Sequence, residues 1–237
     1  MTNMIELHDV RYQWRPQDRY VFTLPHLEIR RGEHIFLQGP SGSGKSTLLG
    51  LLTGILPIQQ GRVVVLGQHL ELMTGRQRDG FRADHFGYVF QMFNLLPYLS
   101  VVENVLLPVA FSSLKRDRLR KHKVEPEQEA ERLLNGLALP WEIHASQKIY
   151  ELSVGQQQRV AVARALMGGP EILICDEPTS ALDEETKEVF VELLFAETQR
   201  HGSTVVFASH DRTLAKLFPR HLQISDVGSF IARETDK

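Results

Sequence analysis

Cysteine is almost absent from this sequence, because Cys175 is the only one among 237 residues. An intramolecular disulfide is therefore impossible, and a hydrophobic core has to hold the fold together, which a chain of this length is able to build. An excess of either charge is also missing, since 27 Lys and Arg stand against 29 Asp and Glu, for a net charge of −2. A general nucleic-acid binder usually carries a basic excess, so we expect no nucleic-acid partner.

Long uninterrupted hydrophobic runs are lacking as well. At the start of the chain no basic segment is followed by an apolar run, so we expect no secretory signal and a cytosolic protein. Eighteen residues between Asp84 and Glu103 carry no formal charge, and the apolar character continues to Leu114. The polar residues and prolines that interrupt this stretch are Gln91, Asn94, Pro97, Ser100, Asn104 and Pro108. A lipid-facing helix would leave these groups without partners, so we interpret the stretch as partly exposed apolar surface of the kind that marks a docking site.

Four short apolar runs rich in β-branched residues predict strands, namely residues 34–37, 63–66, 172–175 and 204–207. Runs of this kind suit strands buried on both faces, as in a parallel sheet covered by helices. Residues 184–200 have a helical period, with Val189, Leu193 and Ala196 on one face, Phe190 and Leu194 beside it, and His201-Gly202 at the end. The alternation of strands and helices predicts right-handed βαβ units.

The middle of the chain, residues 86–150, has no strong strand pattern after Phe90. We interpret it as a helical insertion that contains a basic loop, Lys115–Lys123. The charges of that loop indicate a solvated face, and contact with lipid headgroups is the alternative.

A phosphate-binding loop is predicted at residues 39–46, Gly-Pro-Ser-Gly-Ser-Gly-Lys-Ser, between a predicted strand and an apolar helix at Thr47–Leu56. Glycines let consecutive backbone N–H groups converge on phosphate oxygens, and the helix N-terminus adds partial positive charge. We expect Lys45 to reach the β- and γ-phosphates and Ser46 to ligate Mg²⁺. The full set of predicted nucleotide contacts here is Gly39, Pro40, Ser41, Gly42, Ser43, Gly44, Lys45, Ser46 and Thr47.

Two carboxylates follow the predicted strand at residues 172–175. Neighbouring side chains on a strand point to opposite faces, so the two acids are able to do separate work. We expect Asp176 to hold Mg²⁺ and Glu177 to orient or deprotonate the attacking water. Cys175 is expected to be packed core, because no cationic residue neighbours it in sequence.

A helix N-terminus is predicted where Leu-Ser-Val-Gly-Gln, residues 152–156, opens a long helical run to Leu166. Ser153 and Gln156 have the spacing of a capping box. Such a terminus is also a good anion site, so this motif has a second possible use.

These motifs, in this order, resemble the ATP-binding-cassette (ABC) ATPase family over nearly the whole chain. Gln91 matches the glutamine of the family's Q-loop, Asp183 ends its D-loop at residues 180–183, and His210 matches its switch histidine. Trp14 resembles the family's adenine-stacking aromatic residue. Tyr12 is the second choice, and either residue could simply be half-buried strand surface.

The resemblance implies an α/β fold: a P-loop NTPase (RecA-like) core with a mostly parallel sheet, an N-terminal antiparallel β subdomain and an inserted helical subdomain. Residues 1–88 and about 151–237 would form the nucleotide-binding core, and about 89–150 the helical subdomain of one ABC ATPase domain. ATP and Mg²⁺ are the implied cofactors, with Gln91 as a further Mg²⁺ ligand. Glu177, His210 and Gln91 would be the catalytic residues.

The resemblance also implies a head-to-tail homodimer with two ATP molecules between the copies. Ser153, Gly155, Gln156 and Asp183 of one copy would contact the nucleotide held by the other. A membrane permease subunit would dock near residues 91–114, which places the chain peripherally on the cytoplasmic side of the inner membrane. Val154 departs from the family pattern, which has glycine there. A β-branched residue excludes positive φ and holds the backbone away from a phosphate, so we expect a weaker contact.

The sequences of residues 94–97 and 103–108 are similar to those of the macrolide-efflux, lipoprotein-release and cell-division branch of ABC ATPases. This resemblance favours an extrusion-type exporter. An ATPase that regulates a cell-envelope enzyme through a membrane partner would share every motif. A soluble ABC ATPase of DNA repair or translation usually has a long coiled-coil insertion or two cassettes, and neither is present.

Overall fold

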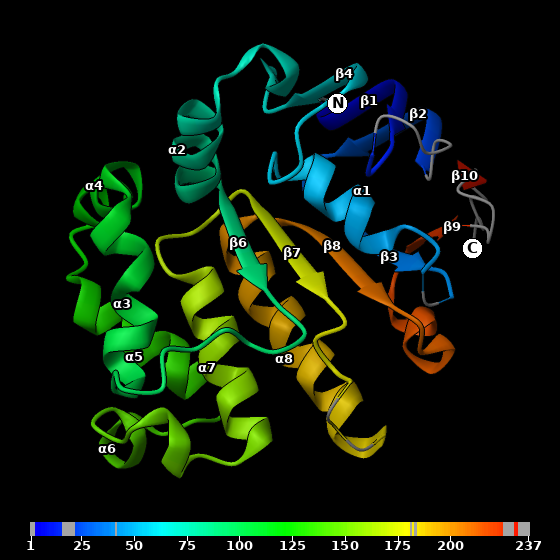
Figure 1. Cartoon of the computed structure of the whole chain (residues 1–237). Coiled ribbons are helices and arrows are strands. Elements are labelled where there is room, and N and C mark those ends of the chain that lie inside the picture. Colours follow the sequence, from blue (N-terminus) through cyan, green and yellow to red (C-terminus); the bar gives the residue numbers. More distant parts are fainter. Residues whose placement is uncertain are drawn as a thin grey trace. The chain divides into compact units, whose positions relative to one another are not determined.

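The computed structural model describes residues 3–15, 22–40, 42–180, 182, 184–224 and 230–231. The chain divides into two compact units, one made of residues 1–82 and 204–237 and the other of residues 83–203. The first unit therefore joins both ends of the sequence, while the second is continuous (Figure 1). In the described ranges, no helix combines the length and the apolar character needed to cross a bilayer.

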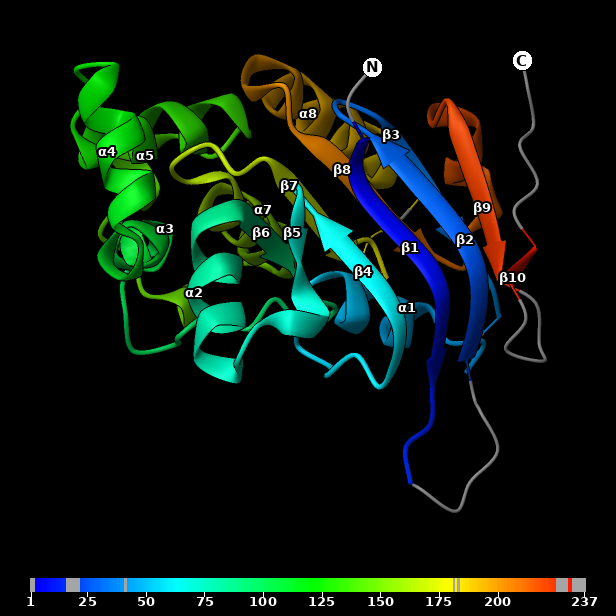
Figure 2. The ribbon, with the colours of Figure 1, turned by 90° about the horizontal axis from the view of Figure 1, so that it is seen from above.

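An antiparallel sheet in the first unit has the strand order β2-β1-β4-β5 (Figure 2). On β1, Ile5 and Leu7 are fully buried, and Leu7 lies between Leu27 of β2 and Val63 of β4. This sheet confirms the antiparallel part of the predicted α/β fold. Its strands are β1 (Asn3–Tyr12), β2 (Phe22–Arg30), β4 (Gln60–Val65) and β5 (Gln68–His69).

The run at residues 63–66 was expected to be a strand of the parallel sheet, and this expectation is wrong. Val63 and Val65 are buried, but both pair in antiparallel register with β1. Leu66 lies outside the strand with a φ of 52° and begins the turn to β5. A run of valines suits either sheet type, and the pairing with β1, more than fifty residues earlier in the chain, decides which one forms.

Parallel strands also form in the first unit, where β3 (His34–Gln38) lies between β8 (Thr204–Ser209) and β9 (Arg220–Ile224). Phe36 of β3 stacks on Phe207 of β8, with ring centroids 6.1 Å apart, and this pair is fully buried. The remaining elements of this part of the chain are α1 (Lys45–Leu52), η1 (Leu70–Leu72), η3 (Arg212–Leu217) and β10 (Phe230–Ile231). Helix α2 (Gly75–His85) begins in the first unit and ends in the second.

The second unit places two parallel strands among helices (Figure 1). Helix α7 contacts β6 as well as α3 and α5, and its face of alanines and valines is buried. The elements are β6 (Phe86–Val89), α3 (Val101–Phe111), α4 (Ser113–Lys121), α5 (Pro126–Gly136), α6 (Trp141–His144), η2 (Ile149–Glu151), α7 (Val154–Leu166), β7 (Ile172–Asp176) and α8 (Glu184–His201).

The basic segment at 115–123 is mostly helix α4 and not a loop, which corrects the sequence prediction. One side of it is not solvated either. Lys115 is only 2% exposed and its ammonium group donates to the carbonyl of Phe86 at 2.9 Å, while Arg118 donates to the carbonyl of Gly169 at 2.8 Å. Burial, with a smaller contribution from Arg118, lowers the pKa of Lys115 to about 8.

The buried face of α8 is rotated from the predicted one. Phe190 and Leu194 are buried, whereas Val189 is 46% exposed. Glu197 is buried on the same side, because its carboxylate accepts a hydrogen bond from Arg132 at 2.7 Å. The spacing of apolar residues assigns a glutamate to the surface. It therefore predicts the position of this helix in the sequence but not which of its faces is buried.

Candidate functional site

The first unit carries the predicted phosphate loop between the end of β3 and the start of α1. Gly44 has a φ of 101°, a region that favours glycine. At Gly39, an added Cβ would lie 2.4 Å from the Oγ atom of Ser43, so no larger residue fits without a shift of that hydroxyl. The loop is therefore folded tightly enough to bring its backbone N–H groups together. Residue 41, the predicted contact Ser41, lies outside the described residues.

The N-terminus of α1 is open. Among the described residues, no side-chain hydrogen bond caps it at Gly44, and its first turn contains no acidic residue. The Oγ atom of Ser43 is buried and has no hydrogen-bond partner among the described residues. A buried hydroxyl without a partner costs free energy, and the partial positive charge of a helix N-terminus attracts anions. Loop and helix together therefore fit a phosphate group.

Lys45 lies across this loop, 7% exposed. Its ammonium group donates to the carbonyl oxygens of Gly39 at 2.7 Å and Pro40 at 3.2 Å. Carbonyls are weaker acceptors for an ammonium group than phosphate oxygens, so a phosphate entering the loop would compete for this cation. Of the two residues that follow Lys45, Ser46 is exposed and Thr47 is buried.

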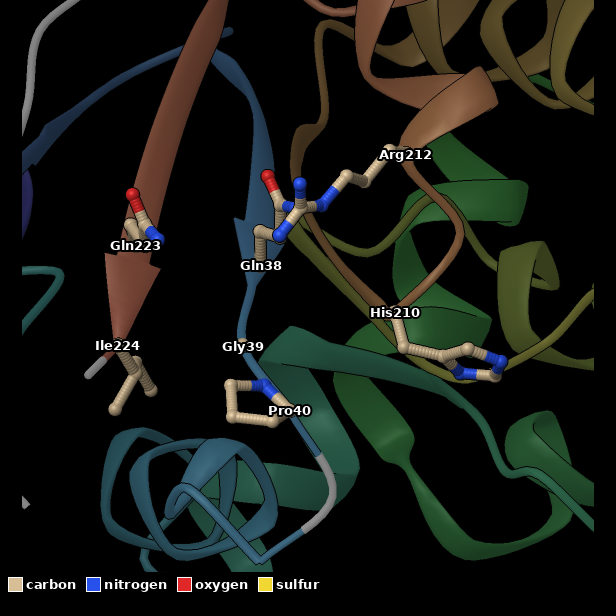
Figure 3. Close-up of a pocket in the computed structure, with 7 residues that line it drawn as sticks. All are labelled: Gln38, Gly39, Pro40, His210, Arg212, Gln223 and Ile224. Atoms are coloured by element: carbon tan, nitrogen blue, oxygen red, sulfur yellow. The ribbon is translucent and has the colours of Figure 1, made fainter. Parts of the chain in front are cut away.

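His210 is placed at the same edge of the sheet as the phosphate loop. Strand β8 runs parallel to β3 with Ser209 paired to Gln38, so His210 and Gly39 each follow their strand by one residue. A cavity of about 370 Å³ opens here (Figure 3). Its lining residues are Gln38, Gly39, Pro40, His210, Arg212, Gln223 and Ile224.

Arg212 and Gln223 were not predicted as site residues. In Figure 3 the side chain of Arg212 extends from η3 toward the end of β3, and Gln223 comes from β9. Arg212 follows His210 by two positions, and this closeness in sequence could have predicted it as a site residue. Gln223 joins the cavity only because β9 pairs with β3, and nothing in its local sequence indicates that.

The second unit carries the acidic pair. Asp176 is half-buried at the end of β7, and Glu177 has a φ of 48°. A left-handed backbone at a residue other than glycine costs free energy and is concentrated at functional sites. Burial raises the pKa of the Tyr88 phenol above its usual value, and the negative charge of Asp176 adds to the effect. Cys175 is fully buried, as predicted, and burial raises the pKa of its thiol.

Gln91 lies in the turn that follows β6, and its side chain is exposed. Strands β6 and β7 are parallel with Val89 paired to Cys175. Since the carboxyl ends of parallel strands meet at one edge, Gln91 and Asp176 emerge from the same edge of this strand pair. The strand pairing thus places at one edge two residues that are 85 positions apart in the sequence.

Ser153 caps the N-terminus of α7, as its spacing predicts. Its Oγ atom accepts from the N–H of Gln156 at 3.3 Å, and Oε1 of Gln156 accepts from the N–H of Ser153 at 2.8 Å. Val154 has an ordinary helical backbone and is 49% exposed. The backbone of Val154 thus avoids positive φ, as expected for a β-branched residue, and the weaker phosphate contact stays a prediction. Val154 thus differs from the family's glycine by a solvent-facing isopropyl group beside Gly155.

Trp14 and Tyr12 differ in exposure. Trp14 is 60% exposed and Tyr12 is 5% exposed, and their rings meet edge to face at 5.2 Å. Gln59 holds the backbone between them, since it accepts from the N–H and donates to the carbonyl of Gln13. Trp14 is thus the residue with a free ring face. Asp183 lies outside the described residues.

Comparisons with known proteins identify the family to which these motifs belong. A profile of the ABC transporter family matches residues 23–180. The ABC transporter ATP-binding protein YtrE of Bacillus subtilis is 40% identical over 200 residues, which are 84% of this chain and 83% of YtrE. The macrolide export ATP-binding/permease protein MacB of Pasteurella multocida is 37% identical over 232 residues, which are 97% of this chain and 34% of MacB.

A solved structure is similar over the whole length. The dimeric structure of the ABC transporter cassette MJ0796, from Methanocaldococcus jannaschii, superposes with a TM-score of 0.84 at 33% identity and covers 99% of this chain and 100% of its own. A dimeric structure of MJ0796 in a post-hydrolysis state, bound to ADP and Pi, superposes with a TM-score of 0.83.

Proposed function

We propose that this chain is the ATPase subunit of an extrusion-type exporter. The premise is that the chain belongs to the ABC transporter family. Membership in the family makes the chain an ATP-binding, ATP-hydrolysing subunit of a transporter complex, with ATP and Mg²⁺ as its cofactors. The direction of transport, the arrangement of the dimer and the roles of single residues belong to the proposal. The observation that carries its nucleotide site is the N-terminus of α1, where the buried ammonium of Lys45 and the Ser43 hydroxyl, which has no partner among the described residues, are placed to bind a phosphate.

The phosphate loop binds the triphosphate in this proposal. Lys45 leaves the carbonyls of Gly39 and Pro40 and donates to the β- and γ-phosphates, while the loop amides and Ser43 bind the remaining oxygens. Trp14 stacks on the adenine, an interaction worth about 1–3 kcal/mol. The complete set of proposed nucleotide contacts within one copy is Trp14 and Gly39–Thr47.

The metal ligands and catalytic residues divide the remaining work. Ser46, Asp176 and Gln91 would hold Mg²⁺, which keeps most of its ligands as water and phosphate oxygens. An ion held by these residues would supply positive charge that stabilises the charge on the phosphates. Glu177 orients and deprotonates the attacking water, and the backbone strain at this residue supports a functional role. His210 contacts the γ-phosphate from the cavity beside the loop.

Two copies would act head to tail. The relative MJ0796 forms a dimeric cassette, and we propose that the α7 N-terminus of one copy lies against the nucleotide of the other. Ser153, Gly155 and Gln156 supply the contacts, with Asp183 beside them. Loss of the γ-phosphate removes the differential affinity for the closed dimer, so the dimer opens after hydrolysis.

A membrane permease subunit would dock near residues 91–114, on the proposed helical subdomain of about residues 89–150. Three large apolar side chains in this stretch are strongly exposed: Met92 at 81%, Tyr98 at 68% and Phe111 at 78%. Exposed apolar surface of this kind supports an interface. The fusion of ATP-binding and permease parts in MacB supports an export partner, and such a partner would hold the chain on the cytoplasmic side of the inner membrane.

Isolation from native membranes tests the proposal. The tagged chain, purified in detergent with ATP, should bring down an integral membrane protein, and Tyr98→Glu should reduce the recovery because it places a charge in the apolar interface. Asp117→Ala, on the exposed side of α4, is the matched control. Recovery of no integral membrane protein by the wild-type chain would overturn the proposal.

A further inference from the structure

The turn that follows Gln91 has a strained backbone. Phe93 has a φ of 59° and Asn94 a φ of 48°. Asparagine tolerates this region, but a bulky residue such as phenylalanine rarely adopts it. The ring of Phe93 is nevertheless buried, at 8% exposure. Strained conformations persist only where the surroundings hold them, so some other group has to hold this turn.

Arg164 of α7 is that group. Its Nη1 atom donates to the carbonyl of Asn94 at 2.7 Å, and its Nη2 atom donates to the carbonyl of Phe93 at 2.6 Å. The planar guanidinium thus bridges two consecutive carbonyls of the strained pair. Burial lowers the pKa of Arg164, and in the described part of the chain no ion pair joins it to a carboxylate. The two carbonyls of this turn are therefore the partners of the half-buried Arg164 guanidinium.

A different helix holds the far side of the same segment. Asn104 of α3 accepts from the N–H of Leu96 at 2.9 Å and donates to its carbonyl at 3.0 Å. Asn104 is fully buried and binds Leu96, two residues beyond Asn94, so this second contact shares no group with that of Arg164. Residues 92–96 are thus fixed at two points, once to α7 and once to α3.

We propose that Arg164 is a positioning residue that makes the Gln91 turn and helix α7 move as one body. Ser153 begins α7 and Arg164 lies eleven residues later, so roughly 16 Å of rigid helix joins the two ends. A displacement of the Ser153 turn would reach Gln91 through this helix. The inference rests on the proposed function for the role of Gln91, whereas the contact itself does not depend on it.

Lysine is not an equivalent of arginine at this position. An ammonium group lacks the planar fork that donates in parallel to two acceptors. Arg164→Lys should therefore keep the charge but hold only one carbonyl at a time. Arg164→Gln should lose both the charge and the bridge. The matched control is Arg159→Gln, on the same helix, which loses one exposed hydrogen bond to the carbonyl of Ala138.

Amide hydrogen exchange, resolved by NMR, tests the contact on the isolated chain. The N–H groups of Phe93 and Asn94 donate to the carbonyls of Phe90 and Met92 and report on the turn. In Arg164→Gln they should exchange at least tenfold faster, while the N–H of Leu96, held by Asn104, changes less than threefold. In Arg164→Lys the exchange rates of Phe93 and Asn94 should be intermediate. This variant provides the test if the glutamine variant does not fold.

Turnover gives the second readout. In Arg164→Gln, kcat for ATP should fall at least threefold with KM within twofold of the wild type, and Arg159→Gln should change neither. Unchanged exchange at Phe93 and Asn94, or full kcat in Arg164→Lys, would overturn the inference. Failure of the wild-type chain to co-isolate with a membrane protein overturns the proposed function instead and leaves the exchange result as it stands.

Discussion

The N-termini of α1 and α7 make a useful comparison, because both have a serine and a glycine and both are predicted to meet phosphates. Among the described residues, no side-chain hydrogen bond caps the N-terminus of α1, and a buried lysine lies across the loop before it. The N-terminus of α7 is closed by its own capping box, in which Ser153 and Gln156 satisfy each other's backbone N–H groups.

The difference separates a site that binds on its own from one that binds only in an assembly. At α1, a phosphate binds the Ser43 hydroxyl, which has no hydrogen-bond partner among the described residues, and replaces two backbone carbonyls as the acceptor for Lys45. At α7, a phosphate has to compete with hydrogen bonds that already exist. We therefore expect the α1 site to bind nucleotide in a single copy of the chain, and the α7 site to contribute only when a second copy holds a nucleotide against it.

Lys45→Ala should have the largest effect, because it removes the cation of the open site. Two charge-assisted hydrogen bonds are worth together about 3–6 kcal/mol, so ATP affinity should fall at least about 100-fold and turnover should be lost with it. Calorimetric titration with ATP measures the affinity. Lys121→Ala, an exposed lysine on α4, is the control. An unchanged affinity would show that the α1 site does not hold the triphosphate through this side chain.

Glu177→Gln should separate binding from turnover. ATP affinity should stay near that of the wild type, and turnover should fall by about 10²–10⁴-fold, the usual contribution of a positioned general base. Because the γ-phosphate then remains in place, dimers should accumulate with ATP and Mg²⁺ in light scattering. Glu192→Gln, an exposed glutamate on α8, is the control. Normal turnover in Glu177→Gln would mean that another residue activates the water.

Ser153→Ala and Ser43→Ala compare the closed and the open terminus directly. Loss of the cap on α7 should lower the free energy of unfolding by about 1 kcal/mol. Ser43→Ala should change it by no more than about 0.5 kcal/mol, since no hydrogen bond is lost, while ATP affinity falls about 2–10-fold. Urea unfolding measures the stability of both variants. Equal losses of stability would break the comparison.

Val154→Gly should have the smallest effect. Because Val154 is exposed and has a helical backbone, its replacement removes no core contact and should cost about 0.5 kcal/mol of stability through the freedom of glycine. Without the isopropyl group, the α7 terminus approaches a phosphate more closely, so dimers of Glu177→Gln should form at several-fold lower ATP concentration. A weaker or unchanged dimer would show that Val154 does not hinder this contact.

The local features of the site could be predicted from the sequence because each one depends on a short segment. The loop at 39–46, the acids at the end of β7 and the capping box at Ser153 all form where their residue types indicate. The face of α8 and the state of residues 115–123 could not be predicted in the same way. Glu197 and Lys115 are polar, and only their partners Arg132 and the Phe86 carbonyl make their burial tolerable.

Hydrophobic pattern, glycine placement and helix capping act over a few neighbours, so the sequence by itself determined the P-loop, its strand and helix, and the family to which they belong. The tertiary structure alone decided which distant residues join them: Arg212 and Gln223 beside the loop, and Arg164 under the turn at Phe93. The reason is that a side chain's partners across the fold depend on strand order and helix packing, which no local propensity encodes.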